Sequence, residues 1–300
     1  MAQKVIMDVD TGCDDAVAML MAGHHKDIEL VAALPVHGNA PLEQTVDNTL
    51  RLLEAGKLSH VPVYVGAEEP LIGPIIRGDG DQIVRLPFPV SGIKPQAQHA
   101  ANFLVEYYMS GEGGNTVYMP IGPLTNLALA LKIEPHLKDR IPKIITMGGS
   151  YASSFAEFNI QADPEAAFIV YSAGIPIVMV GLEVTDMAFI TGVDVDGIRA
   201  IGTPWAVTAA DVMDIVLAIH TKHGKKGAIV FDACAVAAMI EPALLTTEAM
   251  HITIELRGST TRGCTAADQR AWQRLPPNVE VGTSINRMRF LEILHESLME

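Results

Sequence analysis

Four carboxylates stand within eight residues near the N-terminus, in the stretch Asp8–Ala16 (DVDTGCDDA). This stretch directly follows the apolar run Val5-Ile6-Met7, which is typical of a buried strand. Like charges so close together repel one another, and a buried carboxylate without a partner takes up a proton. A bound cation would offset the repulsion, so the spacing predicts a cation site built from oxygen ligands.

Part of this acidic stretch has a simpler explanation. Asp14 and Asp15 open an expected helix, where carboxylates stabilise the helix dipole. That explanation does not cover Asp8 and Asp10, which stand at the end of the expected strand, just before a turn at Gly12. The helix-start interpretation therefore accounts for half of the carboxylates and leaves the cation site for the others.

The residue types around the carboxylates indicate which cation would bind. No Cys or His cluster accompanies them, which argues against zinc. Ca²⁺ accepts carboxylates, backbone carbonyls, waters and substrate hydroxyls, whereas Mg²⁺ usually accompanies phosphates. A carboxylate beside such an ion can also take a proton from bound water. The residues therefore predict a metal-assisted hydrolase or a binder of sugar-like diols.

Short apolar runs alternate with helical patterns along the chain, which predicts an α/β fold with an open, mostly parallel sheet flanked by helices. We expect strands at Lys4–Asp8, Ile28–Val36, Val61–Val65, Asn115–Met119, Pro142–Met147, Pro176–Gly181 and Met250–Leu256. We expect helices at Asp14–Gly23, Pro41–Ala55, Gln96–Met109, Pro123–Leu131, Pro164–Ala173, Trp205–Ile219 and Ile285–Leu298. Pro70–Pro95 and Thr221–Gly227 are expected to be long surface loops.

Polar clusters follow several of the expected strands at their carboxyl ends, which is where ligands bind in open parallel sheets. The clusters are His37-Gly38-Asn39, Pro120–Asn126, Gly148-Gly149-Ser150, Ala156–Pro164 and, later, Phe231-Asp232. Each is weak alone: Gly-Asn and Gly-Gly pairs are usually turns, and Asp163-Pro164 is most simply a helix N-cap. His220 and His223 are expected to be loop residues and not ligands. The convergence of the clusters on one sheet edge predicts a single site.

Composition and charge exclude several classes of function. The 300 residues carry a formal net charge of −14 with no basic run, which argues against nucleic-acid binding. The three cysteines are odd in number and follow no metal spacing, which favours a reducing cytosol over a disulfide framework. The N-terminus lacks a long apolar segment typical of a signal peptide, and no apolar run is long enough for a membrane span. We therefore expect a cytoplasmic protein with a small-molecule ligand.

The stretch DVDTGCDDA resembles the N-terminal aspartate signature of the inosine–uridine preferring nucleoside hydrolase family. Further segments match that family in order: His37-Gly38-Asn39, Pro120–Asn126, Met147-Gly148-Gly149, Ala156–Ile160 and Phe231–Ala237. The resemblance covers nearly the whole chain. It implies a single nucleoside hydrolase domain over residues 1–300 with a Rossmann-like core, assembled as a homodimer or homotetramer.

The resemblance also implies the reaction and its residues. Such enzymes cleave the N-glycosidic bond of ribonucleosides with water, giving ribose and a free nucleobase. A Ca²⁺ ion would be held by Asp10, Asp15, the backbone carbonyl of Ile121 and Asp232, with Asp10 as the general base. The ribose would contact Asp14, Asn39, Met147, Glu157, Asn159 and Asp232, while Asp8 would hold the turn. Cleavage builds positive charge on the sugar, which surrounding carboxylates stabilise.

The sequence departs from the family pattern in three places. Thr11 stands where Pro is common, and Ser150-Tyr151 stands where an Asn often contacts the 5′-hydroxyl. Phe231 replaces a His that many members use to protonate the leaving base, and Phe has no proton to donate. An aromatic residue there resembles the purine-specific branch, so purine nucleosides are weakly favoured. His37 or a loop histidine could then supply the missing acid.

Two alternatives remain from the residues alone. A haloacid-dehalogenase-type phosphatase also uses two aspartates spaced like Asp8 and Asp10 after its first strand. It would want Thr or Val where this chain has Gly12, together with a later lysine and a second acidic motif, and none is convincingly placed. A non-catalytic nucleoside- or sugar-binding protein would need no general base.

Overall fold

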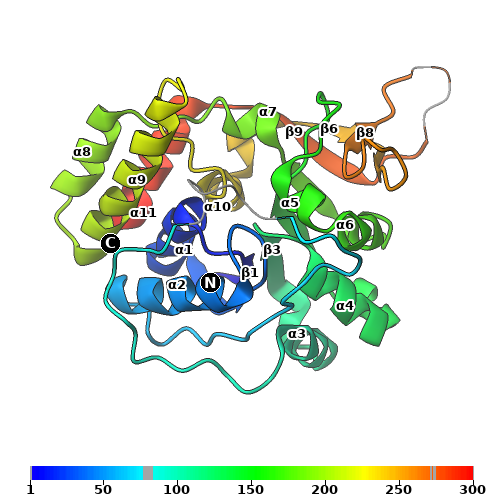
Figure 1. The fold of residues 1–300 in the computed structure, drawn as a ribbon, viewed down its shortest axis with the longest axis horizontal. Coiled ribbons are helices and arrows are strands. Elements are labelled where there is room, and N and C mark those ends of the chain that lie inside the picture. The colour runs from blue at the N-terminus through cyan, green and yellow to red at the C-terminus, as the bar shows by residue number, and fades with distance from the viewer. Residues whose placement is uncertain (1, 77–83, 271, 273–274, 300) are drawn as a thin grey trace.

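A seven-stranded sheet forms the centre of the computed structural model, which describes residues 2–76, 84–270, 272 and 275–299 (Figure 1). The strand order is β2-β1-β3-β4-β5-β9-β6, and only β6 runs antiparallel to its neighbour. The strands are β1 (Gln3–Val9), β2 (Ile28–Pro35), β3 (Thr116–Pro120), β4 (Ile144–Met147), β5 (Ile177–Val180), β6 (Leu245–Met250) and β9 (Val279–Ile285). A separate two-stranded sheet pairs β7 (Ile252–Ile254) with β8 (Thr265–Ala267). The expected open, mostly parallel sheet is therefore confirmed.

Helices cover both faces of this sheet, as the alternation of side chains along a strand requires. In β1, Val5, Met7 and Val9 pack into one apolar core, whereas Ile6 packs into a second core on the other face. The first core is covered by α1 (Cys13–His24), α2 (Leu42–Ala55), α9 (Pro204–Lys222), α10 (Ala233–Ile240) and α11 (Arg287–Met299). The second is covered by α3 (Ala100–Met109), α4 (Thr125–Ile133) and α6 (Pro164–Tyr171). Helix α8 (Gly192–Ala200) adds Val195 and Ile198 to the first core, and two short helices are α5 (Phe158–Ala162) and α7 (Leu182–Thr185).

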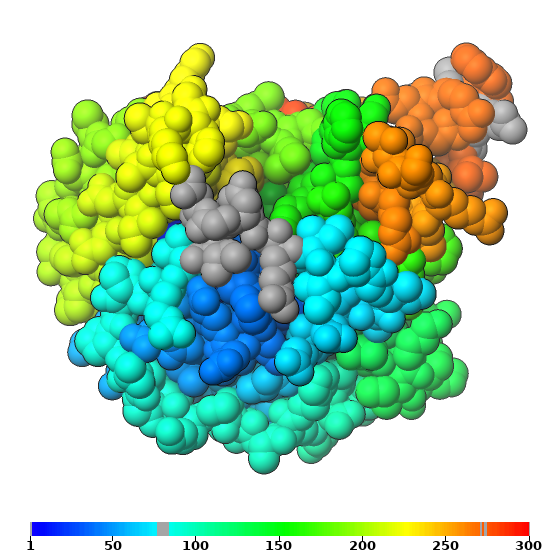
Figure 2. Space-filling model, viewed as in Figure 1, coloured from blue at the N-terminus to red at the C-terminus, as the bar shows by residue number. Residues whose placement is uncertain are grey.

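The path of the chain through the sheet determines where a ligand can bind. Strand β1 pairs in parallel with β2 on one side and with β3 on the other. The chain thus changes its direction of travel across the sheet at β1, and a crevice opens at the carboxyl ends of such strands. Figure 2 shows blue N-terminal residues below the yellow and green residues, with cyan residues on both sides.

The type or the bounds of several expected elements were wrong. Val61–Val65 is not a strand of the sheet: Val63 and Tyr64 form only isolated bridges, to Ala33 and Gln96. Met250–Leu256 divides into the end of β6 and a separate β7. The last helix begins at Arg287, because Ile285 ends β9.

Both expected surface loops need qualification. The first two residues of Thr221–Gly227 belong to α9. Within Pro70–Pro95 the described residues form no helix or strand, and residues 77–83 lie outside the described part of the chain.

Two further expectations from composition can be compared with the structure. Each cysteine, Cys13, Cys234 and Cys264, is buried with a free thiol. Among the described helices, none combines the length and the apolar character that crossing a membrane requires.

Candidate active site

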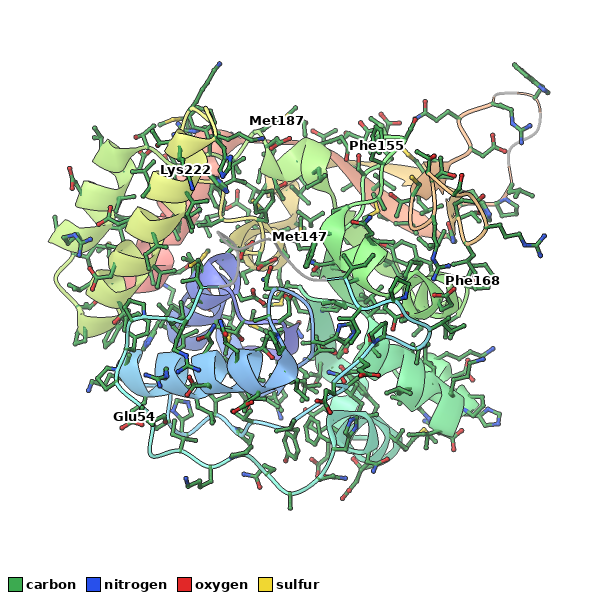
Figure 3. The ribbon with its side chains drawn as sticks, in the orientation of Figure 1. Glu54, Met147, Phe155, Phe168, Met187 and Lys222 are labelled. Atoms are coloured by element: carbon green, nitrogen blue, oxygen red, sulfur yellow. The ribbon has the colours of Figure 1, made fainter. Side chains whose placement is uncertain are left out.

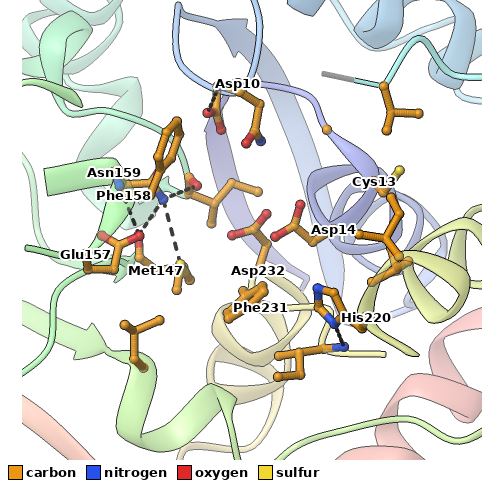
Figure 4. Close-up of a pocket in the computed structure, with 18 of the residues that line it drawn as sticks. Asp10, Cys13, Asp14, Met147, Glu157, Phe158, Asn159, His220, Phe231 and Asp232 are labelled. Atoms are coloured by element: carbon orange, nitrogen blue, oxygen red, sulfur yellow. Dashed lines mark hydrogen bonds between the residues drawn. The ribbon is translucent and has the colours of Figure 1, made fainter. Parts of the chain in front are cut away.

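A cavity of about 290 Å³ lies at the carboxyl ends of the parallel strands (Figure 4). Its wall includes every residue that the sequence assigned to a site except Asp15. These residues are Asp10, Asp14, Asn39, Ile121, Met147, Glu157, Asn159, Phe231 and Asp232. Segments far apart in the sequence thus meet at one place, and Figure 3 shows Met147 near the middle of the molecule while Glu54 and Phe155 lie towards its rim.

Asp10 is held in place by its own strand end and by the loop after β2. Its Oδ2 accepts a hydrogen bond from the backbone N–H of Asn39 at 2.7 Å. Two glycines allow the backbone to come this close. A Cβ atom on Gly38 would lie 2.1 Å from Oδ2 of Asp10, and one on Gly122 would lie 2.9 Å from Oδ1. The glycines of the two neighbouring loops therefore make room for this carboxylate.

Asp15 is fully buried and joins the first turn of α1 to the end of β1. Its Oδ1 accepts from the backbone N–H of Asp10 at 3.1 Å, and its Oδ2 accepts from that of Gly12 at 2.8 Å. The expected stabilisation of the helix start is present in this geometry. Asp15 also lies close to the carboxylates of Asp14 and Asp232.

Asp14, Asp15 and Asp232 form a group that could hold a metal ion. One carboxylate oxygen from each lies within 4.8 Å of those of the other two. Asp232 immediately precedes α10, and Asp14 and Asp15 belong to the first turn of α1, so packing of these two helices brings the group together. Asp10 lies beside this group through its backbone contact with Asp15, but is not itself a member.

Burial and mutual repulsion raise the pKa values of these carboxyl groups. Burial is the largest cause in each case, and it raises the pKa of Asp14 to about 6 and that of Asp15 to about 8. The pKa values of Asp10 and Asp232 rise well above the usual range, through burial and then through the charges of neighbouring aspartates. Among the described residues lining the cavity, none is Lys or Arg. Oxygen donors without a cationic side chain fit a hard metal ion.

The opposite wall is fixed by Glu157 and Asn159. Glu157 caps α5, and its carboxylate accepts backbone N–H groups of Gly149, Asn159 and Ile160 at 2.9–3.2 Å. Asn159 donates from Nδ2 to the carbonyl of Ile121 at 2.8 Å. This network holds the ends of β3 and β4 in fixed positions around the cavity.

Asp8 has a structural role, as expected, but its side chain bonds to residues of β3 and α4 and does not hold the turn at Gly12. It is fully buried outside the cavity, accepting hydrogen bonds from the hydroxyl of Tyr118 and from Nδ2 of Asn126. Its burial raises its pKa to about 7. Asp163 caps α6 by accepting from the backbone N–H of Ala166 at 3.0 Å, as expected. Nε2 of His37 lies 3.0 Å from Oγ1 of Thr125, and His37 is not among the residues lining the cavity.

Comparison with known proteins identifies the family. The profile of the inosine-uridine preferring nucleoside hydrolases matches residues 5–292. The chain belongs to this family. It is therefore an N-glycosyl hydrolase, which decides against the phosphatase and the non-catalytic binding protein.

Relatives of this nucleoside hydrolase have different base preferences in their names. The pyrimidine-specific ribonucleoside hydrolase RihA of Enterobacter sp. (strain 638) is 36% identical, over 100% of this chain and 99% of its own. The inosine-uridine preferring nucleoside hydrolase of Leishmania major is also 36% identical, over 90% and 89%. Among solved structures, the purine-preferring ribonucleoside hydrolase from Gardnerella vaginalis has a TM-score of 0.91 and 29% identity, covering 99% of this chain and 98% of that one. These matches establish the fold and the reaction class.

One end of the nucleoside hydrolase cavity is formed by residues that the sequence analysis did not assign to the site. Val216, Ile219 and His220 come from the end of α9, and Ile229 comes from the segment before Phe231. The other lining residues are Gly12, Cys13, Val84, Ala156, Phe158 and Leu182. The expectation that His220 is a loop residue was wrong, because α9 continues to Lys222. The apolar spacing of Val216 and Ile219 before His220 was the available signal for one helix face.

Proposed function

We propose that this protein is a Ca²⁺-dependent ribonucleoside hydrolase that releases ribose and a free nucleobase, with purine nucleosides favoured. The observation that carries the proposal is the convergence of four aspartates, Asp10, Asp14, Asp15 and Asp232, beside an apolar cavity wall. Carboxylates suit the sugar end, where positive charge develops, and apolar side chains suit a flat nucleobase.

Asp10 is proposed as the general base. A bound Ca²⁺ would supply water of lowered pKa and an anchor for vicinal sugar hydroxyls. The proposed ligands are Asp10, Asp15, the backbone carbonyl of Ile121 and Asp232. The hydrogen bond from Asn39 keeps one oxygen of Asp10 oriented, so that the other can accept the proton of the attacking water.

The ribose is proposed to lie between the two carboxylate-bearing walls, in contact with Asp14, Asn39, Met147, Glu157, Asn159 and Asp232. In this position, the growing positive charge at C1′ faces several carboxylates in a buried setting. Electrostatic stabilisation of this kind acts most strongly where water is excluded. Glu157 and Asn159 are well suited because their hydrogen bonds to the backbone keep them from moving.

Phe231 is proposed to stack on the base. It is adjacent to Asp232 in sequence and lines the cavity together with Ile229 and Val216. A larger purine ring has more surface to stack, which supports the purine preference. We further propose that residues 1–300 act as one domain, and that the enzyme works in the cytoplasm as a homodimer or homotetramer.

The decisive experiment is a substrate panel. Inosine, adenosine, guanosine, uridine and cytidine are each incubated with the purified protein, with and without Ca²⁺ after chelation, and ribose release is measured. The proposal predicts Ca²⁺-dependent ribose release, with a higher kcat/KM for the purine nucleosides. Release of ribose from pyrimidine nucleosides alone would refute the purine preference, and no release from any of them would refute the proposed function.

A further inference from the structure

His220 stands at the base end of the cavity and has no role in the mechanism above. It lies in the last turn of α9, is half-buried, and lines the same cavity as Phe231. The two rings meet edge to face, with centroids 6.1 Å apart and planes 78° apart. Figure 4 shows His220 beside Phe231, on the side of the cavity that also holds Asp14 and Asp232. A base stacked on Phe231 would therefore lie within reach of the imidazole.

A backbone contact fixes which ring nitrogen of His220 carries the proton. The backbone N–H of Ile229 donates to Nδ1 at 3.1 Å. A neutral imidazole that accepts at Nδ1 must carry its hydrogen on Nε2. In Figure 4 the nitrogen that is not bonded to Ile229 is turned towards the centre of the cavity. The fold thus presents an N–H donor to the space proposed for the base.

The neutral form is also the one that the surroundings favour. Burial lowers the pKa of His220, and the charges of Lys225 and His223 lower it further. The backbone carbonyl of Gly227 raises this pKa by less than burial and the charge of Lys225 lower it, and the charge of Asp186 raises it least. A neutral ring at pH 7 keeps Nδ1 available to the N–H of Ile229.

Among the described lining residues, the other side-chain donors either bond to a protein group or are weak. Asn39 donates to Asp15 at 3.4 Å, and Asn159 donates to the carbonyl of Ile121 at 2.8 Å. The thiol of Cys13 is a weak donor, and Phe231 has none. A departing base carries an extra electron pair and therefore needs a donor. In the described wall, His220 meets this need.

We propose that His220 donates a hydrogen bond from Nε2–H to an acceptor atom of the leaving nucleobase, and so supplies the donor that Phe231 cannot. This inference rests on the proposed function. The water oxygen bonds to C1′ as the C1′–N bond breaks, and that bond's electron pair goes to the base. Asp10 takes the proton of the water, and the Nε2–H bond stabilises the base anion. Solvent then protonates the base and takes the proton back from Asp10.

The first test separates donation from packing. His220→Phe removes the donor and keeps a ring, whereas His220→Gln keeps an N–H at a similar distance from the backbone. The exposed His136, which does not line the cavity, is changed to Phe as the control. Each variant is assayed with inosine and with p-nitrophenyl riboside, whose leaving group departs without help. Thermal unfolding of each variant checks that it is folded.

We expect His220→Phe to lower kcat for inosine by about 10- to 100-fold, the loss typical of a hydrogen bond to a charged group. Turnover of p-nitrophenyl riboside should stay within about twofold of wild type because that reaction needs no donor. His220→Gln should recover part of the loss, and His136→Phe should resemble wild type. An equal loss on both substrates, or no loss on either, would overturn the role of His220 while leaving the proposed function standing.

The second test determines the tautomer of the His220 ring directly. A long-range ¹H–¹⁵N spectrum of the protein, with the His220 signals assigned from their absence in His220→Gln, gives the tautomer. We expect the Nε2–H form at pH 7. The Nδ1–H form would contradict the inference whatever the kinetics show. If wild type hydrolyses no nucleoside at all, it is the proposed function that fails.

Discussion

The backbone N–H of Asn39 donates a 2.7 Å hydrogen bond to Oδ2 of Asp10, which ties the loop after β2 to the carboxylate at the end of β1. This contact depends on the missing side chain of Gly38, where a Cβ atom would lie 2.1 Å from Oδ2 of Asp10. The position of the proposed general base is therefore set by a residue that does no chemistry itself.

Gly38→Ala should displace Asp10 and lower kcat for inosine by about 100-fold, because catalytic groups lose much of their effect when misplaced by about 1 Å. Steady-state kinetics with inosine measure this. Gly92→Ala is the control, since a Cβ atom there would meet no atom within 4 Å. Unchanged kcat in Gly38→Ala would show that the placement of Asp10 tolerates movement of this loop.

Asp10→Asn and Asp15→Ala should both be nearly inactive, but for different reasons. Asp10→Asn should keep much of the metal affinity and lose the base that activates water. Asp15→Ala should lose metal affinity, so that a large excess of Ca²⁺ restores part of its activity by mass action. Activity titrated against Ca²⁺ distinguishes the two variants. Full wild-type activity after exhaustive chelation would contradict a metal-centred mechanism.

Without metal, stability should fall as pH rises. The folded protein has raised pKa values, about 6 for Asp14 and about 8 for Asp15, whereas unfolded aspartates titrate near pH 3.9. The folded state therefore binds more protons between these values. The stabilisation is fully present below about pH 4 and is lost as pH rises through about 6 and 8.

Calorimetric melting of the chelated protein between pH 5 and pH 9, about the window of these raised pKa values, measures this effect. Added Ca²⁺ should reverse the loss, and Asp15→Asn should flatten the slope. A Tm of the chelated protein that rises steadily with pH would be incompatible with buried, mutually repelling carboxylates.

A nucleoside that carries a 5′-phosphate should be a poor substrate. The described cavity wall holds carboxylates and no Lys or Arg. A buried phosphate without a cationic partner is costly, so kcat/KM for inosine monophosphate should be about 100-fold or more below that for inosine. Parallel assays of ribose or ribose 5-phosphate release test this. Comparable values would overturn the placement of the sugar beside Glu157.

Phe231→Ala should lower kcat/KM for inosine by about 10- to 100-fold, the range expected for loss of one base–aromatic stack. The loss should be smaller for p-nitrophenyl riboside. Phe231→His could return an acid to this position and shift preference towards pyrimidine nucleosides. Relative kcat/KM values for inosine and uridine measure the shift. Unchanged turnover of inosine and adenosine by Phe231→Ala would make Phe231 a packing residue and remove the support for purine preference.

The sequence predicted the layers and the sheet edge well, because buried parallel strands read as apolar runs and their polar ends converge. The prediction of secondary structure failed where the local residue pattern favours a strand but the backbone does not form a continuous strand pairing. Val61–Val65 has a strand-like composition, yet Pro62 has no N–H to donate to a ladder, and only isolated bridges form. The sequence analysis did not predict α8. This helix contains Gly192 and Gly197, and its first turn is stabilised by reciprocal hydrogen bonds between Thr191 and Asp194.

The candidate site also contains some residues that could be predicted from the sequence and others that could not. Asp10 and Asp14 of the cavity wall were predictable because several carboxylates crowded near a strand end demand an explanation. The proposed base end was not predictable, because Val216, Ile219 and Ile229 are ordinary apolar residues whose shared wall exists only after folding. His220 was misplaced for one reason: the end of a helix is poorly marked when no Gly or Pro follows at once.

The two ends of the cavity come from different parts of the chain. Asp10, Asn39, Ile121 and Met147 stand at or after the ends of neighbouring parallel strands, whereas Val216, Ile219 and His220 stand on one helix that packs against α1 and α8. Replacements on that helix can accumulate in a lineage without shifting the strand ends. Divergence within such a family should therefore alter which base is accepted long before it alters the bond that is cut, and relatives named for pyrimidines and for purines can share this one scaffold.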